Sequence, residues 1–249
     1  MTIQDERDLL GLMKIGRICA QTMHYMIDQV AVGMTTGDLD ALGANFLRKH
    51  GARSAPILMY HYPATTCISV NEEIAHAIPG KRVINPGDVV NIDVSAELDG
   101  YIADTGASMI VPPAAEAAEK LLARTQTALT KALEVITAGA PLNQIGRVIE
   151  GEARKYGYKV LRELGGHGVG RSLHEYPRNI PNYFSPRLRT RMTDGLVFTV
   201  EPFLNMGVGK IKQNQDGWTL TSVDGSLSAQ FEHTIVVTRG KPVIVTALA

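Results

Sequence analysis

Two short stretches of this chain end in a carboxylate in the same way, 108 positions apart. They are residues 87–93, GDVVNID, and residues 195–201, GLVFTVE. In each stretch the apolar residues alternate, so a strand would turn them to the core and turn Asp93 and Glu201 to the opposite face. The repetition predicts two equivalent strands that offer two acids to one shared site.

The repeat extends upstream of these stretches. Residues 48–51, RKHG, recur as residues 154–157, RKYG, and Gly33 recurs as Gly139. Three segments that follow in the same order at nearly one offset are hard to attribute to chance. We therefore expect a single domain over residues 1–249, built from two similar halves of about 1–111 and 112–249.

A hairpin in the first half predicts a partner for Asp93. Asp-Gly at residues 99–100, between two alternating runs, signals a two-residue turn that fixes the register of the flanking strands. In that register Asp93 pairs with Gly106, and Asp104 lies on the same face as Asp93. Diagonal neighbours of this kind are about 7 to 8 Å apart at the backbone, close enough for both carboxylates to reach one ion or ion pair.

The second half supplies Glu201 and also Glu232, the one acid on an expected strand over residues 230–237. Four inward carboxylates would repel one another unless they were protonated or neutralised, and cations are the usual remedy. His167 stands in a glycine-rich turn, GGHGVG at residues 165–170, which leaves its imidazole unobstructed. An imidazole shifts the preferred ion from magnesium or calcium toward manganese, iron, cobalt or zinc.

Each of these residues taken alone has an ordinary explanation. A single strand acid usually faces solvent, a single histidine is usually a hydrogen-bonded surface or core residue, and a glycine run is usually a turn. Acids at matched places in a repeat, a same-face hairpin partner and a histidine in an open turn support one another. Together they favour a metal site.

The glycine-rich turn has a competing interpretation as a phosphate cradle. The dinucleotide fingerprint requires a third glycine, and Arg171 occupies that position. The P-loop pattern is also missing. The zinc-binding His-Glu-x-x-His pattern fails because His174-Glu175 is followed by Arg178 where the second histidine would stand.

Composition narrows the setting. The chain is 45% hydrophobic, and its 25 basic and 25 acidic residues cancel without long runs of either sign, so we expect no nucleic-acid binding. The charged N-terminus and the lack of any run of 18 apolar residues predict a cytoplasmic protein that does not enter the membrane. Cys19 and Cys67 are too few to staple a chain of this size, and we expect no disulfide.

Helices must position the strands that carry the acids. Thr36 and Asp38 are suited to cap the second of four expected helices, and glycines end all four. Two helices followed by strands, twice over, indicate an α+β domain with helices on one face of a mostly antiparallel sheet. The apolar stripes that predict the helices cover residues 9–30, 39–46, 121–136 and 142–149.

This constellation resembles that of the methionine aminopeptidases, and the likeness covers nearly the whole chain. It implies their pseudo-two-fold symmetric "pita-bread" α+β fold. Residues 174–201 leave no room for the long insertion of the type II enzymes, and no zinc-finger extension is expected, so the chain resembles the short bacterial type I enzymes. The motifs that carry the likeness are NID at residues 91–93, DT at 104–105, GHGVG at 166–170, TVEP at 199–202, QFEHT at 230–234, CISVNE at 67–72, HAIP at 76–79, HEYP at 174–177, DGWT at 216–219 and LSAQ at 227–230.

The resemblance implies a role for each acid and for His167. Asp93 would chelate one divalent ion, His167 and Glu201 the other, and Asp104 and Glu232 would bridge both. The two ions would be cobalt, manganese, iron or zinc. A water or hydroxide between them would attack the amide after the first residue, because metals lower its pKa.

Further residues are assigned by the same resemblance. Glu201 would accept and carry the proton, and His76 and His174 would contact the scissile amide and stabilise the tetrahedral intermediate. A methionine side chain would lie among Tyr62, Cys67 and Trp218. The chain departs from the family pattern around this pocket, at Pro56, Met59, Leu173, Ala75 and Ala77.

The expected activity is removal of the N-terminal methionine from nascent proteins and peptides whose second residue is small. We expect a cytoplasmic monomer, and association with the ribosome is left open. One alternative is a proline-directed exopeptidase on the same fold, although those relatives usually carry a large N-terminal domain. Another is a non-catalytic module that binds metal or peptide, against which the five complete ligands argue.

Overall fold

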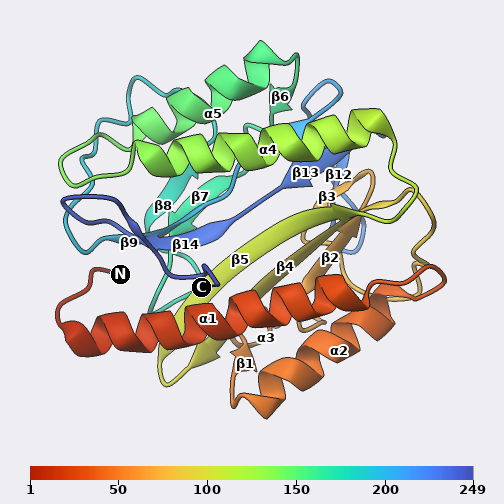
Figure 1. The fold of residues 1–249 in the computed structure, drawn as a ribbon, viewed down its shortest axis with the longest axis horizontal. Helices are drawn as coiled ribbons and strands as arrows, with labels where there is room; N and C mark the ends of the chain where they lie inside the picture. The colour runs from red at the N-terminus through yellow and green to blue at the C-terminus, as the bar shows by residue number, and fades with distance from the viewer. Residues whose placement is uncertain (249) are drawn as a thin grey trace.

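The computed structural model describes residues 1–248 (Figure 1). The four expected helices are present, and a short fifth helix occurs between the second of them and the first long strands. The bounds of the helices are α1 (Glu6–Gln29), α2 (Thr36–Lys49), α3 (Ala55–Tyr60), α4 (Glu116–Glu134) and α5 (Asn143–Lys155).

The strands form four sheets in which every pairing is antiparallel. Their bounds are β1 (Arg53–Ser54), β2 (Cys67–Val70), β3 (Glu73–Ala75), β4 (Val89–Leu98), β5 (Tyr101–Ile110), β6 (Lys159–Val160), β7 (Gly165–Gly168), β8 (Glu175–Pro181), β9 (Val197–Val200), β10 (Phe203–Asn205), β11 (Ile211–Gln213), β12 (Leu220–Ser222), β13 (Ser228–Gln230), β14 (His233–Val236) and β15 (Val243–Ile244). The expected antiparallel α+β class is confirmed.

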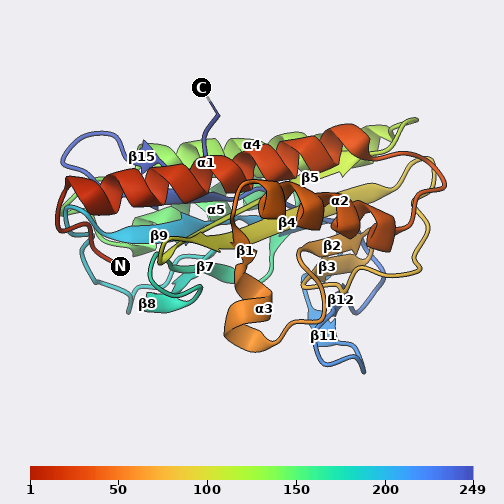
Figure 2. The same cartoon turned by 90° about the horizontal axis from the view of Figure 1, so that it is seen from below.

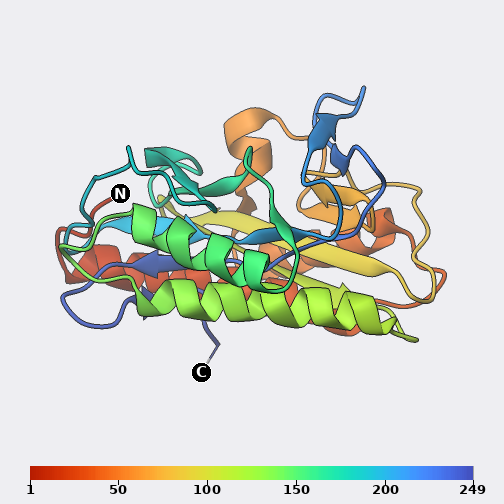
Figure 3. The same ribbon diagram turned by 90° about the horizontal axis from the view of Figure 1, so that it is seen from above.

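The long helices α1 and α4 lie on one face of the sheets, and the short helix α3 lies on the other. Figure 2 shows α1 and α4 above the long strands, whereas α3, β8 and the β11–β12 hairpin lie below them, and Figure 3 shows the same layers from the other side. One apolar cluster lies between α1, α2 and the β4–β5 hairpin, and a second lies under α4 and α5. The apolar core therefore lies between the long helices and the sheets, and the opposite face of the sheets is available for a functional site.

One expected cap is shifted by a residue. Thr35, and not Thr36, caps α2, and it forms a capping box with Asp38. Thr36 is already the first residue of the helix, and its hydroxyl accepts a 2.9 Å hydrogen bond from the Gly80 amide. Two adjacent threonines offered the same cap, and tertiary contacts decided between them.

The short helix α3 has no counterpart among the sequence predictions. Its six residues are too few to show an apolar period, and Pro56 within it is a residue that usually breaks helices. Pro56 is tolerated because it lies in the first turn, where its missing N–H leaves no hydrogen bond unmade.

Glycines that repeat in the sequence adopt matching conformations. The Gly33 amide donates to the Ile84 carbonyl at 2.9 Å, and the Gly139 amide donates to the Met192 carbonyl at 2.8 Å. Both glycines are in the left-handed region, which favours residues without a side chain. The matched φ values are 88° and 90° for Gly33 and Gly139, 72° and 79° for Gly51 and Gly157, and 85° and 80° for Gly87 and Gly195.

No helix within residues 1–248 is both long and apolar enough to cross a membrane. Cys19 and Cys67 are both buried as free thiols, the first against the β4–β5 hairpin and the second opposite Asp93 on β2.

Candidate metal centre

The β4–β5 hairpin has the register expected from its turn. Asp99 and Gly100 both have positive φ, 54° and 81°, as a two-residue primed turn requires. Asp93 pairs with Gly106, and Asp104 pairs with Ser95 two residues further along β4. The two acids therefore lie diagonally across the hairpin on one face.

Glu201 and Glu232 meet through strands that are distant in sequence. β9 and β14 are antiparallel and pair Val200 with His233. Glu201 directly follows Val200 and Glu232 directly precedes His233, so the two glutamates lie side by side just beyond this pair. The expectation of one strand over residues 230–237 was wrong, because Glu232 lies in the break between β13 and β14. This break is fixed by two hydrogen bonds to β5. The Glu232 amide donates to the Gly106 carbonyl at 2.8 Å, and the Thr105 hydroxyl donates to the Glu232 carbonyl at 2.8 Å.

His167 lies in strand β7, and the expected open turn was therefore also wrong. The glycines beside it allow close strand packing. A Cβ on Gly166 would be 2.1 Å from the Thr199 carbonyl oxygen, and one on Gly168 would be 2.3 Å from that of Tyr176. The glycine run thus permits crowding that any side chain would prevent.

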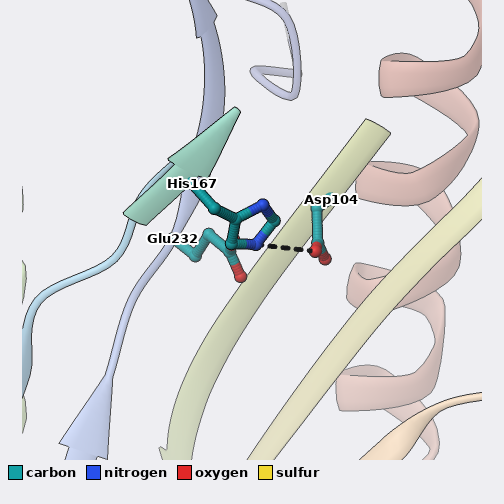
Figure 4. A group of neighbouring side chains, drawn as sticks. All are labelled: Asp104, His167 and Glu232. Carbon is teal, nitrogen blue, oxygen red and sulfur yellow. Dashed lines mark ion pairs between the residues drawn. The ribbon is translucent and has the colours of Figure 1, made fainter. Parts of the chain in front are cut away.

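The imidazole of His167 turns one nitrogen toward the acids. Its Nδ1 lies 3.2 Å from the Gly168 carbonyl oxygen, which can only accept, so Nδ1 carries the proton and Nε2 has the free lone pair. Nε2 lies 3.7 Å from Asp104 Oδ2 and 3.5 Å from Glu201 Oε1. Figure 4 shows the ring directed at Asp104 with Glu232 beside it.

Two carboxylate oxygens at this place are buried without a partner. Ligand atoms of Asp104, His167 and Glu232 all lie within 4.8 Å of one another. Among the described residues, Asp104 Oδ1 and Glu232 Oε1 accept no hydrogen bond although they are shielded from solvent. A buried carboxylate oxygen without a donor is costly, and a cation at the centre of these atoms would satisfy both. The donor set therefore fits a metal ion.

The pKa values in the cluster have shifted in the directions that such crowding causes. Burial raises the pKa of Asp93 to about 6 and raises those of Asp104, Glu201 and Glu232 well above their ordinary values, with repulsion among the acids adding to the effect for the last three. Burial also lowers the pKa of His167 to about 3, so its imidazole is neutral and able to bind a metal.

Neutral polar residues hold the acids from behind. The Thr199 hydroxyl donates to Glu201 Oε1 at 2.9 Å, and the side-chain amide of Gln230 donates to Glu232 Oε2 at 3.1 Å. Asn91 in turn donates to Gln230 Oε1 at 2.8 Å. Sequence reasoning did not select these three residues. A usable signal was present, because each precedes an acid of the cluster by two positions, which on a strand places both side chains on the same face.

The acids open into a cleft of about 530 Å³. All ten residues predicted for the site line this cleft, as do Pro56 and Leu173, whereas Met59 is not among its lining residues. Tyr60, Glu163 and Arg178 also line it and were not selected from the sequence, because no motif or periodicity singles them out. The predicted lining residues are Asp93, Asp104, His167, Glu201, Glu232, His76, His174, Tyr62, Cys67 and Trp218.

The apolar part of the cleft lies beside the acids. Cys67 pairs with Asp93 across β2 and β4, and it is packed with Tyr62 and Trp218. The Tyr62 hydroxyl donates to the Ala77 carbonyl at 2.8 Å, and the Tyr62 and Trp218 rings meet edge to face with centroids 5.1 Å apart. This wall is soft, aromatic and rigidly held, which suits an apolar side chain.

His76 and His174 face the cleft, where both are solvent-exposed. The surrounding protein nevertheless lowers the pKa of His76 to about 4 and lowers that of His174, in both cases mainly by desolvation. Both rings are therefore neutral near pH 7. His76 has a φ of 55°, uncommon for a residue with a side chain and often found at functional sites.

Comparison with known proteins gives consistent results for sequence and structure. The sequence model of the family described as Metallopeptidase family M24 matches residues 11–239 of this chain. The chain is 44% identical to "Methionine aminopeptidase 2" of Bacillus subtilis, with all of both chains covered. It is similar to the crystal structure of methionine aminopeptidase from Rickettsia prowazekii, with a TM-score of 0.95 and 38% identity over 99% of this chain and 100% of the other.

Similarity to a proline-directed enzyme is confined to the fold. The prolidase from Pyrococcus horikoshii aligns with a TM-score of 0.78 and 20% identity, covering all of this chain and 64% of the other.

Proposed function

The chain belongs to metallopeptidase family M24, and from this premise we propose that its acid-lined cleft removes the N-terminal methionine from peptides and newly made proteins. The relatives named methionine aminopeptidase support the activity because they match over essentially the full length of the chain. The observation that carries the proposal is the convergence of ligand atoms of Asp104, His167 and Glu232 in the lining of one cleft, where each of the two carboxylates keeps a buried oxygen without a partner.

Five side chains would hold two divalent ions. Asp93 would bind one ion, His167 and Glu201 the other, and Asp104 and Glu232 would bridge both. When bound, the ions supply Lewis-acid activation of the attacking water and a contact for the substrate's free amine. The mixture of four carboxylates and one imidazole suits manganese, iron, cobalt or zinc, and does not choose among them.

The protein's own residues would then handle the proton and the substrate. Glu201 is held at Oε1 by Thr199 and is the proposed proton acceptor and carrier. His76 and His174 are neutral and face the cleft, so each can exchange a hydrogen bond with the scissile amide without adding charge. The free amine requirement limits cleavage to the first residue, because an internal peptide bond presents no such group.

The apolar wall formed by Tyr62, Cys67 and Trp218 would accept the methionine side chain. We expect a small second residue to be favoured, as implied by the resemblance. Nascent chains carrying an initiator methionine would be the substrates. We therefore expect a monomeric enzyme in the cytoplasm, and association with the ribosome is left open.

The test is a peptide cleavage panel on metal-depleted protein with each ion restored separately. Met-Ala-Ser should be cleaved after methionine once manganese, cobalt, iron or zinc is added, and Ala-Pro substrates should not be cleaved. Asp104→Ala should abolish the activity, because it removes a bridging ligand. Preferential cleavage of Ala-Pro would replace the proposal with a proline-directed activity. Full hydrolysis of Met-Ala-Ser by Asp104→Ala would overturn it, and metal binding without any cleavage would indicate a binding module.

A further inference from the structure

A tyrosine at the cleft contacts one of the two non-ligand histidines. The Tyr60 hydroxyl lies 2.7 Å from Nδ1 of His174, 114 positions away in sequence, and the two rings have centroids 5.5 Å apart. The His174 ring also lies close to that of His167, with centroids 4.0 Å apart. His174 is thus held between Tyr60 and a proposed metal ligand.

Tyr60 is fixed by the short helix that it ends. Ser54 caps the start of α3, since its hydroxyl accepts from the Ile57 amide and donates to the Thr65 carbonyl at 2.8 Å. His61 ends α3 in the left-handed conformation, and Tyr62 beyond it is buried and hydrogen-bonded. The backbone position of Tyr60 is therefore set by the fold on both sides of the residue, and its hydroxyl is oriented by the contact with His174.

The direction of the hydrogen bond follows from the acidity of the two groups. A phenol has an ordinary pKa of about 10, whereas the N–H of a neutral imidazole is a far weaker acid. The stronger donor arrangement has Tyr60 donating to the lone pair of Nδ1. The imidazole proton is then on Nε2, which forms no hydrogen bond with any protein group among residues 1–248.

We propose that Tyr60 is a positioning residue that fixes His174 in the tautomer with its proton on Nε2. His174 then offers a neutral N–H donor to the carbonyl oxygen of the scissile amide, where negative charge develops as the amide is attacked. The inference rests on the function proposed for the cleft and on the role proposed there for His174. It adds a residue that acts through His174 and does not itself touch the reacting atoms.

The kinetic test is Tyr60→Phe in the metal-loaded enzyme, with Met-Ala-Ser as substrate. Loss of one hydrogen bond should lower kcat by about threefold to tenfold. KM should change by less than about twofold, because the phenyl ring keeps the shape of the cleft wall. Tyr25→Phe is the matched control, since Tyr25 packs on Phe46 outside the cleft and loses the same hydroxyl.

A double-mutant cycle separates positioning from a general structural effect. Tyr60→Phe should have no further effect on kcat in a His174→Ala background, because no ring remains to be oriented. An equal loss in both backgrounds, or an unchanged kcat in the single variant, would overturn the inference.

The tautomer is measured directly in the zinc-loaded protein, which is diamagnetic. Long-range ¹H–¹⁵N correlation spectra should show His174 with a protonated Nε2 in the wild type and a mixture of tautomers in Tyr60→Phe. A protonated Nδ1 in the wild type would overturn the inference. If the wild type cleaves no methionyl peptide with any ion, the proposed function fails, whereas this spectrum still decides whether Tyr60 sets the tautomer.

Discussion

The Thr199 hydroxyl donates a 2.9 Å hydrogen bond to Glu201 Oε1, and it accepts a 3.0 Å hydrogen bond from the backbone amide of His167. One hydroxyl thus links two proposed ligands of the same ion. Thr199 lies within β9 and is fully buried, so the link is protected from competing water. The geometry of the site depends on residues behind the ligands as much as on the ligands.

Thr199→Val should weaken metal binding without changing the fold. The substitution keeps the branched shape but leaves Glu201 Oε1 and the His167 amide without their partner. Loss of a group that orients a ligand typically lowers metal affinity about 10- to 100-fold. Isothermal titration with Mn²⁺ checks this. Thr125→Val is the matched control, because Thr125 is also fully buried but lies in α4. Equal affinities for the two variants would refute the expectation.

Asp104→Asn should abolish cleavage and stabilise the metal-free protein. The substitution removes one acid from a buried cluster whose members repel one another when ionised and in which Asp104 Oδ1 has no partner. We expect the melting temperature in a chelator to rise by about 2 to 4 °C, equivalent to about 1 kcal/mol for a chain of this size.

The control for this substitution is Asp88→Asn. Asp88 is also buried, but its carboxylate accepts hydrogen bonds from the Asn71 side chain and from the backbone N–H of Asn85. Thermal unfolding should show no gain for this variant. A lower melting temperature for Asp104→Asn than for the wild type, with both free of metal, would contradict the idea that the acids are strained without an ion.

Metal affinity should rise with pH. Burial raises the pKa of Asp93 to about 6 and also raises those of Asp104, Glu201 and Glu232, so the acids of the metal-free protein hold protons more readily than ordinary carboxyl groups do. An ion must displace these protons. Mn²⁺ titrations from about pH 5.5 to 8 should show increasing affinity. Affinity that does not depend on pH would count against the carboxylate site.

The same shifts affect stability, with a definite sign. An acid whose folded pKa exceeds its unfolded value stabilises the folded state below the unfolded pKa, and this contribution is lost as pH rises through the folded pKa. For Asp93 the window runs from about 4 to about 6. The increase in melting temperature on adding Mn²⁺ should therefore grow with pH, and Asp104→Asn should flatten this dependence.

Gly166→Ala should destabilise the sheet that carries His167. A Cβ there would lie 2.1 Å from the Thr199 carbonyl oxygen, so β7 and its neighbour would have to separate. Overpacking of this kind costs about 1 to 3 kcal/mol. Gly151→Ala in α5 is the matched control, because nothing lies within 4 Å of the added carbon and alanine favours a helix. Chemical denaturation should show opposite changes for the two variants, and a neutral Gly166→Ala would contradict the close packing.

Local patterns in the sequence were enough for much of the fold. The apolar stripes predicted α1, α2, α4 and α5, and Asp99-Gly100 predicted the register that pairs Asp93 with Gly106. These features depend on neighbours within one helix or one hairpin. The short helix α3 and the break before β14 were missed, since six residues show no period and a break needs a partner strand to reveal it.

The sequence by itself determined which residue types are available for chemistry, because a repeat marked Asp93 and Glu201 and the motifs marked the other ligands and histidines. Only the tertiary structure decided how they meet. The pairing of β9 with β14 brings Glu201 beside Glu232, and close packing at Gly166 brings His167 Nε2 to within 3.5 Å of Glu201. Tyr60 reaches His174 across 114 residues in the same way. Such contacts join segments whose spacing along the chain carries no period, and burial of a shared core, not local propensity, fixes them.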